Sequence, residues 1–167
     1  DFVSRGTLRP TPTDLGAMAR KLVALAEDDA RSHGVTMRLD AAVTRLTTVD
    51  ALQLEQALVN VINNAVDAAS EASRAPGCVT VRVMAMGAGM RIDIEDNGPG
   101  VPEVVARQLF EPFVTTKPEG MGLGLALARE LVAAHGGTIR WEHREPEEGT
   151  RFIIELTAIN VLEAEFI

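Results

Sequence analysis

The spacing of apolar side chains along the chain predicts three helices. In residues 13–34, 50–73 and 122–137, apolar side chains recur every three or four positions, so that they share one face of a helix. Asp50 is a suitable N-cap for the second segment, and Gly34 ends the first. Each predicted helix therefore has an apolar face that must be buried against another layer.

Six other segments alternate apolar and polar residues, as strands with one buried face do. They are residues 35–41, 44–50, 78–86, 90–96, 138–144 and 150–156. The glycine-rich turn at 87–89 joins the third and fourth segments as a hairpin, and two consecutive pairs look antiparallel. We therefore expect an α+β fold: a two-layer α/β sandwich with a mixed sheet of about five strands and three main helices on one face.

Two segments follow neither pattern. Residues 1–12, with Pro10 and Pro12, look like a linker that follows something upstream. Residues 97–121 show no clear period apart from a short helix near Pro102. A compact domain seldom carries so long an irregular segment unless that segment is functional.

Composition excludes several classes of protein. The chain has 167 residues, 46% of them hydrophobic, and a net charge of −8, which argues against nucleic acid and anionic membranes as partners. The single cysteine, Cys78, excludes an internal disulfide, fits a reducing compartment and is expected to be buried in a strand. Because no apolar run approaches the ~18 residues of a membrane span, a cytoplasmic location is the default expectation.

The second predicted helix carries an unusual number of amides. Asn60 and Asn64 lie one turn apart, on a polar face that also includes Asp67. Asparagine disfavours a helix by up to ~0.7 kcal/mol relative to alanine, so a purely solvated face is a costly use of it. Amide oxygens suit Mg²⁺ when phosphates supply most of its other ligands. On this helix alone, a solvated face and a functional face remain equally open.

The motif DNGPG, residues 96–100, follows an apolar strand. The carboxylate of Asp96 is therefore expected to be partly buried and ionised, and it needs a hydrogen-bond donor. The exocyclic amine of adenine is such a donor, and Gly98 and Gly100 would let the backbone approach a flat ring. A simple Asx turn is the alternative interpretation.

A third element, GMGLGLA, opens the last predicted helix with Gly120, Gly122 and Gly124. Free N–H groups and the positive end of the helix dipole make such a terminus an anion site. The glycines do not directly follow a strand, and no Walker-type GKS or GKT sequence accompanies them, which disfavours both common nucleotide folds. Phosphate binding itself remains compatible with this pattern.

Taken together, these segments resemble the ATP-binding domain shared by sensor histidine kinases, type II topoisomerases, mismatch-repair ATPases and heat-shock chaperones, the GHKL superfamily with the Bergerat fold. The resemblance is carried by NVINNA (60–65), DNGPG (96–100), LFEPFVTTK (109–117), GMGLGLALARELVAAHGG (120–137) and GTRF (149–152). It is greatest to histidine kinases of the nitrogen-regulation and oxygen-sensing type. It implies that residues 97–121 include a long ATP lid.

The resemblance also implies a role for each matching residue. Asn64 would coordinate Mg²⁺, supported by Asn60, and Asp96 would accept from the adenine amine with help from Thr150 through water. Lys117 of the lid would reach the terminal phosphates. The remaining implied nucleotide contacts are Asp67, Gly98, Gly100, Gly120, Gly122, Leu123 and Gly124. Phe110 and Phe113 would anchor the lid on the domain, or simply belong to the core.

One position separates kinases from hydrolases in this superfamily. The ATP-hydrolysing relatives have a glutamate four residues before the metal-binding asparagine, where it acts as general base on water. This chain has Asn60 there, and an amide cannot take a proton. The implied chemistry is phosphoryl transfer by positioning and charge neutralisation. An ATPase of the same fold and a non-enzymatic interaction module are the alternatives.

Asn63 departs from relatives that have a basic residue at that place, which puts one phosphate contact in doubt.

The implied protein is larger than this chain. We expect residues 1–12 to follow a dimerising hairpin that carries the phosphoaccepting histidine, residues 13–158 to form the catalytic domain, and residues 159–167 to be a tail of unknown role. The expected partners are ATP, that hairpin and the receiver domain of a response regulator, which takes the phosphoryl group on an aspartate. The intact protein would be a homodimer, whereas the fragment can be monomeric.

Overall fold

The computed structural model describes residues 8–42, 45–114 and 123–157. Within these ranges the helices are α1 (Leu15–Ser32), α2 (Ala51–Ser70), α3 (Glu103–Ala106) and α4 (Gly124–Ala134). The strands are β1 (Thr11–Asp14), β2 (Val35–Asp40), β3 (Leu46–Val49), β4 (Gly77–Met86), β5 (Gly89–Asp96), β6 (Thr138–His143) and β7 (Thr150–Leu156).

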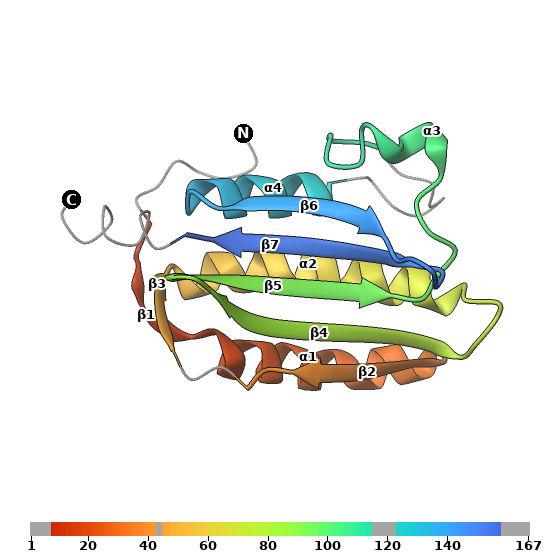
Figure 1. The fold of residues 1–167 in the computed structure, drawn as a ribbon, viewed down its shortest axis with the longest axis horizontal. Coiled ribbons are helices and arrows are strands. Elements are labelled where there is room, and N and C mark those ends of the chain that lie inside the picture. The colour runs from red at the N-terminus through yellow and green to blue at the C-terminus, as the bar shows by residue number, and fades with distance from the viewer. Residues whose placement is uncertain (1–7, 43–44, 115–122, 158–167) are drawn as a thin grey trace.

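The domain has two layers. A five-stranded sheet with the order β2-β4-β5-β7-β6 forms one layer, and α1, α2 and α4 cover one of its faces (Figure 1). The strand pair β2–β4 is parallel, whereas β4–β5, β5–β7 and β6–β7 are antiparallel. The predicted two-layer sandwich, its hairpin and its five-stranded mixed sheet are thus confirmed.

A second, two-stranded sheet was not predicted. Strand β1 pairs antiparallel with β3, with Thr11 opposite Val49. Pro12 lies inside β1. Proline has no N–H to donate, but a strand that pairs on one side only tolerates it where its nitrogen faces away from the partner strand. The strand expected at 44–50 therefore exists as β3, but it belongs to this small sheet rather than to the main one.

Side-chain caps fix where the two longest helices begin. Asp50 accepts the N–H of Gln53 at 3.1 Å and caps α2, as predicted. Asp14 accepts the N–H of Ala17 at 3.0 Å and caps α1, which was not predicted. Burial tends to raise the pKa of Asp50, but the N–H groups of Arg9 and Gln53 outweigh it and hold that pKa below its ordinary value.

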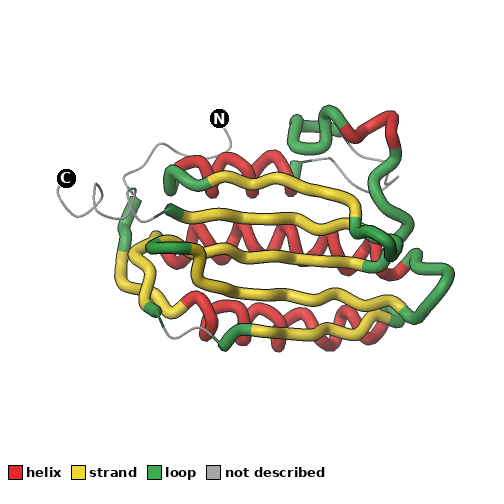
Figure 2. Tube along the Cα trace, in the orientation of Figure 1, coloured by secondary structure: helices red, strands yellow, loops and turns green. Residues whose placement is uncertain are grey.

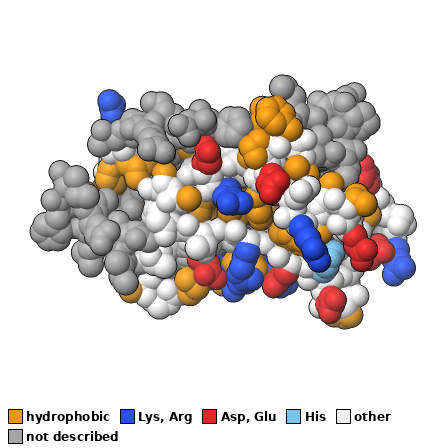
Figure 3. Space-filling view, turned by 90° about the horizontal axis from the view of Figure 1, so that it is seen from above, with side chains coloured by type: hydrophobic (Ala, Val, Ile, Leu, Met, Phe, Trp, Pro, Cys, Tyr) orange, Lys and Arg blue, Asp and Glu red, His pale blue; other side chains and the backbone are white. Residues whose placement is uncertain are grey.

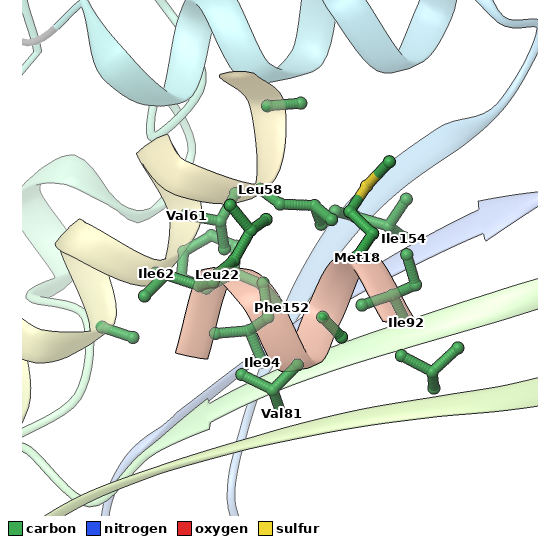
Figure 4. Packing of buried hydrophobic residues seen from close by; sticks show 14 of the residues in the cluster. Met18, Leu22, Leu58, Val61, Ile62, Val81, Ile92, Ile94, Phe152 and Ile154 are labelled. Carbon is green, nitrogen blue, oxygen red and sulfur yellow. The ribbon is translucent and has the colours of Figure 1, made fainter. Parts of the chain in front are cut away.

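The hydrophobic core lies between the helices and the sheet (Figure 4). On α2, Leu54, Val61 and Ala65 are fully buried, which confirms the face predicted from their spacing. They pack over the inward side chains of the sheet, among them Ile94 and Phe152. The burial of this long apolar face holds α2 rigidly across the sheet, so its polar residues have fixed positions.

His135 ends α4 and ties it to the start of α2. Its Nε2 accepts the backbone N–H of Asp50 at 3.1 Å, so Nδ1 carries the proton and donates to the carbonyl of Leu131 at 2.8 Å. His135 is the C-cap residue of α4, and its contact with Asp50 fixes the relative positions of the two helices. None of the helices in the described ranges combines the length and apolar character needed to cross a bilayer.

Candidate functional site

Asp96 and Thr150 lie side by side where two neighbouring strands meet the irregular segments. Asp96 is the last residue of β5, Thr150 is the first of β7, and the two are paired in the ladder. Their exposed fractions are 1% and 3%. Because side chains alternate along a strand, both continue the inward rows of Ile94 and Phe152 toward the helical layer.

The carboxylate of Asp96 also shapes the turn that follows it. Its Oδ1 accepts the N–H of Gly98 at 2.9 Å, and its Oδ2 is shielded from solvent. The Asx turn considered from the sequence is therefore present. Since a carboxylate accepts up to about four hydrogen bonds, this turn is compatible with a further role for the group in ligand binding.

Close backbone contacts explain two glycines around this turn. A Cβ at Gly98 would clash with the carbonyl of Ala68 on α2, and a Cβ at Gly149 would clash with the carbonyl of Asp96. Gly100 has a φ of 89° and lies near the ring of His143. The turn after β5 is thus pressed between α2 and the β6–β7 loop, at the right-hand end of Figure 2.

The amide-bearing face of α2 leads toward the beginning of α4. Asn60 and Asn64 are half-buried, and Asp67 is exposed. The Oδ1 of Asn60 lies 3.4 Å from the place that a Cβ on Gly124 would occupy, so α2 and α4 approach each other closely there. The structure therefore brings Asn60 to the N-terminus of α4. The sequence predicts an anion site at this terminus.

The start of α4 has the features expected of such a site. The helix begins at Gly124 with Leu123 at the N-cap position, and no described side chain caps it. Within the part of the chain that the structure describes, no side chain occupies its first-turn N–H groups, which is the arrangement that suits an anion. The other predicted residues of this region and of the lid, Lys117, Gly120 and Gly122, lie outside the described residues.

The two predicted lid anchors behave differently. The ring of Phe110 meets the buried ring of Phe152 edge to face, with centroids 6.0 Å apart, and it packs against the core. Phe113 is 70% exposed and has a φ of 67°, so the prediction that it anchors the lid is wrong. The reason is local: the left-handed backbone at Phe113 turns its side chain away from the apolar layer that Phe110 has already joined.

Two residues that support the turn were not predicted from the sequence. Asn97 accepts the N–H of Cys78 at 2.8 Å and donates to the carbonyl of Pro76 at 2.8 Å. Arg144 donates to the carbonyl of Asp96 at 3.3 Å. Asn97 lies within the DNGPG motif, so its amide next to a buried carboxylate could have indicated a residue that holds the turn. Nothing in the local sequence around Arg144 indicated its contact.

The donor set fits a magnesium ion held mainly by a ligand rather than by the protein. The described residues contain no cluster of three or more His, Cys, Asp or Glu that could hold a metal. A half-buried Asn64, one turn after the Asn60 that contacts Gly124, suits a hard cation whose other ligands are phosphate oxygens and water. This chemistry agrees with the expectation drawn from the asparagines of α2.

Comparison with models of known protein families shows to which family this chain belongs. Residues 49–159 match the family described as histidine kinase-, DNA gyrase B-, and HSP90-like ATPase. The chain belongs to this family. The matched residues include α2, the turn after β5, α4 and β7, which are the elements that form the candidate site.

Curated relatives place this ATPase domain among sensor kinases. The chain is 36% identical over 141 residues to the C4-dicarboxylate transport sensor protein DctS of Rhodobacter capsulatus, covering 83% of this chain and 21% of that protein. It is 33% identical over 160 residues to the sensor protein FixL of Bradyrhizobium diazoefficiens, covering 95% and 31%. The chain thus spans less than a third of these relatives, and the resemblance to sensor histidine kinases is confirmed for the ATPase domain.

Solved structures agree with this placement. Full-length ShkA in complex with AMPPNP superimposes with a TM-score of 0.80 at 28% identity, covering 93% of this chain and 32% of that one. The catalytic domain of histidine kinase ThkA gives 0.78 at 29%, covering 89% and 95%. ThkA in complex with the response regulator protein TrrA gives 0.75 at 28%, covering 89% and 42%.

Proposed function

We propose that this ATPase domain binds Mg-ATP and transfers the γ-phosphoryl group to a histidine on a dimerisation hairpin outside this chain. In that step the bond from the β–γ bridging oxygen to phosphorus breaks, a nitrogen–phosphorus bond forms, and ADP leaves. A response-regulator aspartate would take the phosphoryl group next. A homodimer through the hairpin and a cytoplasmic location belong to the same proposal.

The observation that carries the proposal is the burial of Asp96 beside Thr150. A carboxylate that is 1% exposed at a strand end, facing the helical layer, is well placed to select a ligand that brings its own N–H donor. The adenine amine is such a donor, and Gly98 and Gly100 keep the neighbouring backbone free of side chains. Thr150 adds a hydroxyl beside the carboxylate.

The phosphates would be held by the beginning of α4 and by α2. The backbone N–H groups at the beginning of α4, after Leu123 and Gly124, favour negative charge. Gly120, Gly122 and Lys117 belong to the same predicted binding set. Asn64 would hold Mg²⁺, with Asn60 and Asp67 nearby on the same helix. When bound, the ion would neutralise charge on the phosphates.

Asn60 favours transfer to a histidine over hydrolysis. It lies against Gly124, next to the N-terminus that would hold the phosphates, and its amide cannot accept a proton from water. The residues of the site therefore position the phosphoryl group without activating a competing nucleophile. The complex of the histidine kinase ThkA with the response regulator protein TrrA supports the proposed downstream partner.

The proposal is tested by mixing the purified chain with γ-labelled Mg-ATP, with and without a hairpin fragment that contains the phosphoacceptor histidine. We expect micromolar-to-millimolar nucleotide affinity, little ADP release by the chain alone, and label on the hairpin only when both are present. A hairpin with its histidine replaced by glutamine is the matched control. Steady ADP release without the hairpin would instead assign the domain to the ATPases. Nucleotide binding with no transfer to any hairpin would assign it to the interaction modules.

A further inference from the structure

The face of the sheet away from the helices carries a hollow that the proposed function does not use. Side chains alternate along β4, so Val79 and Val81 enter the core while Cys78, Thr80 and Arg82 face outward and are half-buried. Cys78 was expected to be buried, and its outward position corrects that expectation. In Figure 1 this face is turned toward the viewer. Figure 3 views the molecule from the upper side of Figure 1, where α4 and β6 lie.

The hollow has a volume of about 410 Å³, which is within the usual range for sites that bind small molecules. It lies at the end of the sheet where β4 begins and β5 ends. Its walls come from β2, β4 and the ends of β5 and β6. The described residues that line it with polar side chains are Thr36, Arg38, Cys78, Thr80, Arg82, Glu95, Asn97 and Arg144.

The charge of this lining is opposite to that of the whole protein. Three arginines and one carboxylate line the hollow among the described residues, although the chain has a net charge of −8. The carboxylate, Glu95, is bound by Arg82 at 2.7 Å and by Arg151 at 2.6 Å. Arg144 lies 3.9 Å from its other oxygen. The three arginines and one carboxylate of the lining leave the hollow with a formal excess of positive charge.

Two of the three arginines are held in place by the protein. Arg82 is bound to Glu95, and Arg144 donates to the carbonyl of Glu148 at 3.2 Å and to the carboxylate of Glu147 at 3.1 Å. Bound in this way, their guanidinium groups lose little further entropy when a ligand arrives. They form a preorganised wall.

Arg38 differs from the other two. It is exposed on the edge strand β2, opposite Thr80 in the parallel ladder. It forms no hydrogen bond or ion pair with any residue in the described ranges. Asp40, the nearest acidic residue on the same strand face, lies opposite Arg82 in the ladder. A free guanidinium above a fixed basic wall is the arrangement that captures an anion with several oxygens.

We propose that this hollow binds a small phosphorylated molecule, with Arg38 closing over a phosphate that rests against Arg82 and Arg144. The hydroxyls of Thr36 and Thr80 can donate to the same oxygens. The site is distinct from the nucleotide site, because Glu95 and Asp96 are consecutive residues of β5 and point to opposite faces of the sheet.

Cys78 provides a local readout of this site. It is the single cysteine of the sequence and lines the hollow, so a ligand there should shield its thiol. The experiment measures the rate of alkylation by iodoacetamide, a neutral reagent that charge does not steer, with and without 10 mM inorganic pyrophosphate. Potassium chloride at matched ionic strength controls for screening.

We expect pyrophosphate to slow alkylation of the wild-type chain by at least about threefold, which corresponds to millimolar affinity. Arg38→Gln should abolish the protection, whereas Arg31→Gln, the same charge change at an exposed position of α1, should retain it. Asp96→Asn should also retain it, so failure of the proposed nucleotide site would leave this result unchanged. Absence of protection in the wild type, or equal protection in Arg38→Gln, would overturn the proposal.

Discussion

The backbone N–H of Gly98 donates to Oδ1 of Asp96 at 2.9 Å, so the carboxylate closes the turn that leaves β5. The same carboxylate is 1% exposed and faces the helical layer. A structural role and a ligand-binding role therefore meet in one side chain. They can be separated, because an asparagine at this position keeps an oxygen for Gly98 and loses only the negative charge.

We therefore expect Asp96→Asn to weaken ATP binding while the fold is retained. A hydrogen bond to a charged group contributes about 1.5–3 kcal/mol, so the Kd should rise roughly 10- to 150-fold. Isothermal titration with Mg-ATP measures the affinity, and urea unfolding checks the fold. An unchanged Kd would remove Asp96 from the nucleotide site.

A second prediction concerns the metal. Asn64→Ala should abolish the magnesium dependence of nucleotide binding, because the proposed metal ligand is lost. The matched control is Asn63→Ala, one residue earlier on α2, where the side chain is exposed. Nucleotide titrations with and without magnesium measure the effect. If Asn64→Ala and Asn63→Ala show the same dependence as the wild type, other groups hold the ion.

Asn97 should be important for stability rather than for contact with the nucleotide. Its side chain joins the turn after β5 to Cys78 and Pro76 at the start of β4. Asn97→Ala leaves the N–H of Cys78 without that acceptor, which should lower the free energy of unfolding by about 1–3 kcal/mol. Urea unfolding measures this change, with Asn63→Ala as a surface control. A change within about 0.5 kcal/mol, the usual scale for surface substitutions, would show that water replaces the amide.

A fourth prediction concerns pH. Burial tends to raise the pKa of Glu95, but the hydrogen bonds from Arg82 and Arg151 outweigh it, so the pKa lies below its ordinary value. A carboxyl whose pKa is lower in the folded state adds stability above its unfolded pKa of about 4.3 and loses it as pH falls through the folded pKa. Glu95→Gln should therefore cost about 1.5–3 kcal/mol at pH 7.

The same reasoning fixes how this cost varies. The difference in unfolding free energy between wild type and Glu95→Gln should shrink as pH falls below about 4.3. Urea unfolding at a series of pH values measures it. Glu155→Gln serves as the comparison, since Glu155 has a longer contact of 3.4 Å to the half-exposed Arg140 and should show a smaller cost. A difference that grows in acid would contradict the assigned ion pairs.

Much of this protein is determined locally by its sequence. Asp50 caps α2, the spacing of Leu54, Val61 and Ala65 defines a buried face, and the glycines at 87–89 close a hairpin. These features depend on hydrogen bonds and side-chain periodicities within a few residues, which a linear pattern displays directly. The motifs that resemble the ATPase family are short and contiguous too, so the order of residues along the chain is enough to recognise them.

Other features were decided only by the tertiary structure. The pairing of Asp96 with Thr150, the parallel partnership of β2 with β4, and the contact of Arg144 with Asp96 join segments far apart in the sequence. Strand order depends on which faces can be buried together, and a pattern of alternating residues specifies a face without naming its neighbour. The exposed ring of Phe113 shows the same limit, since apolar character alone does not say whether the backbone will carry a side chain into the core.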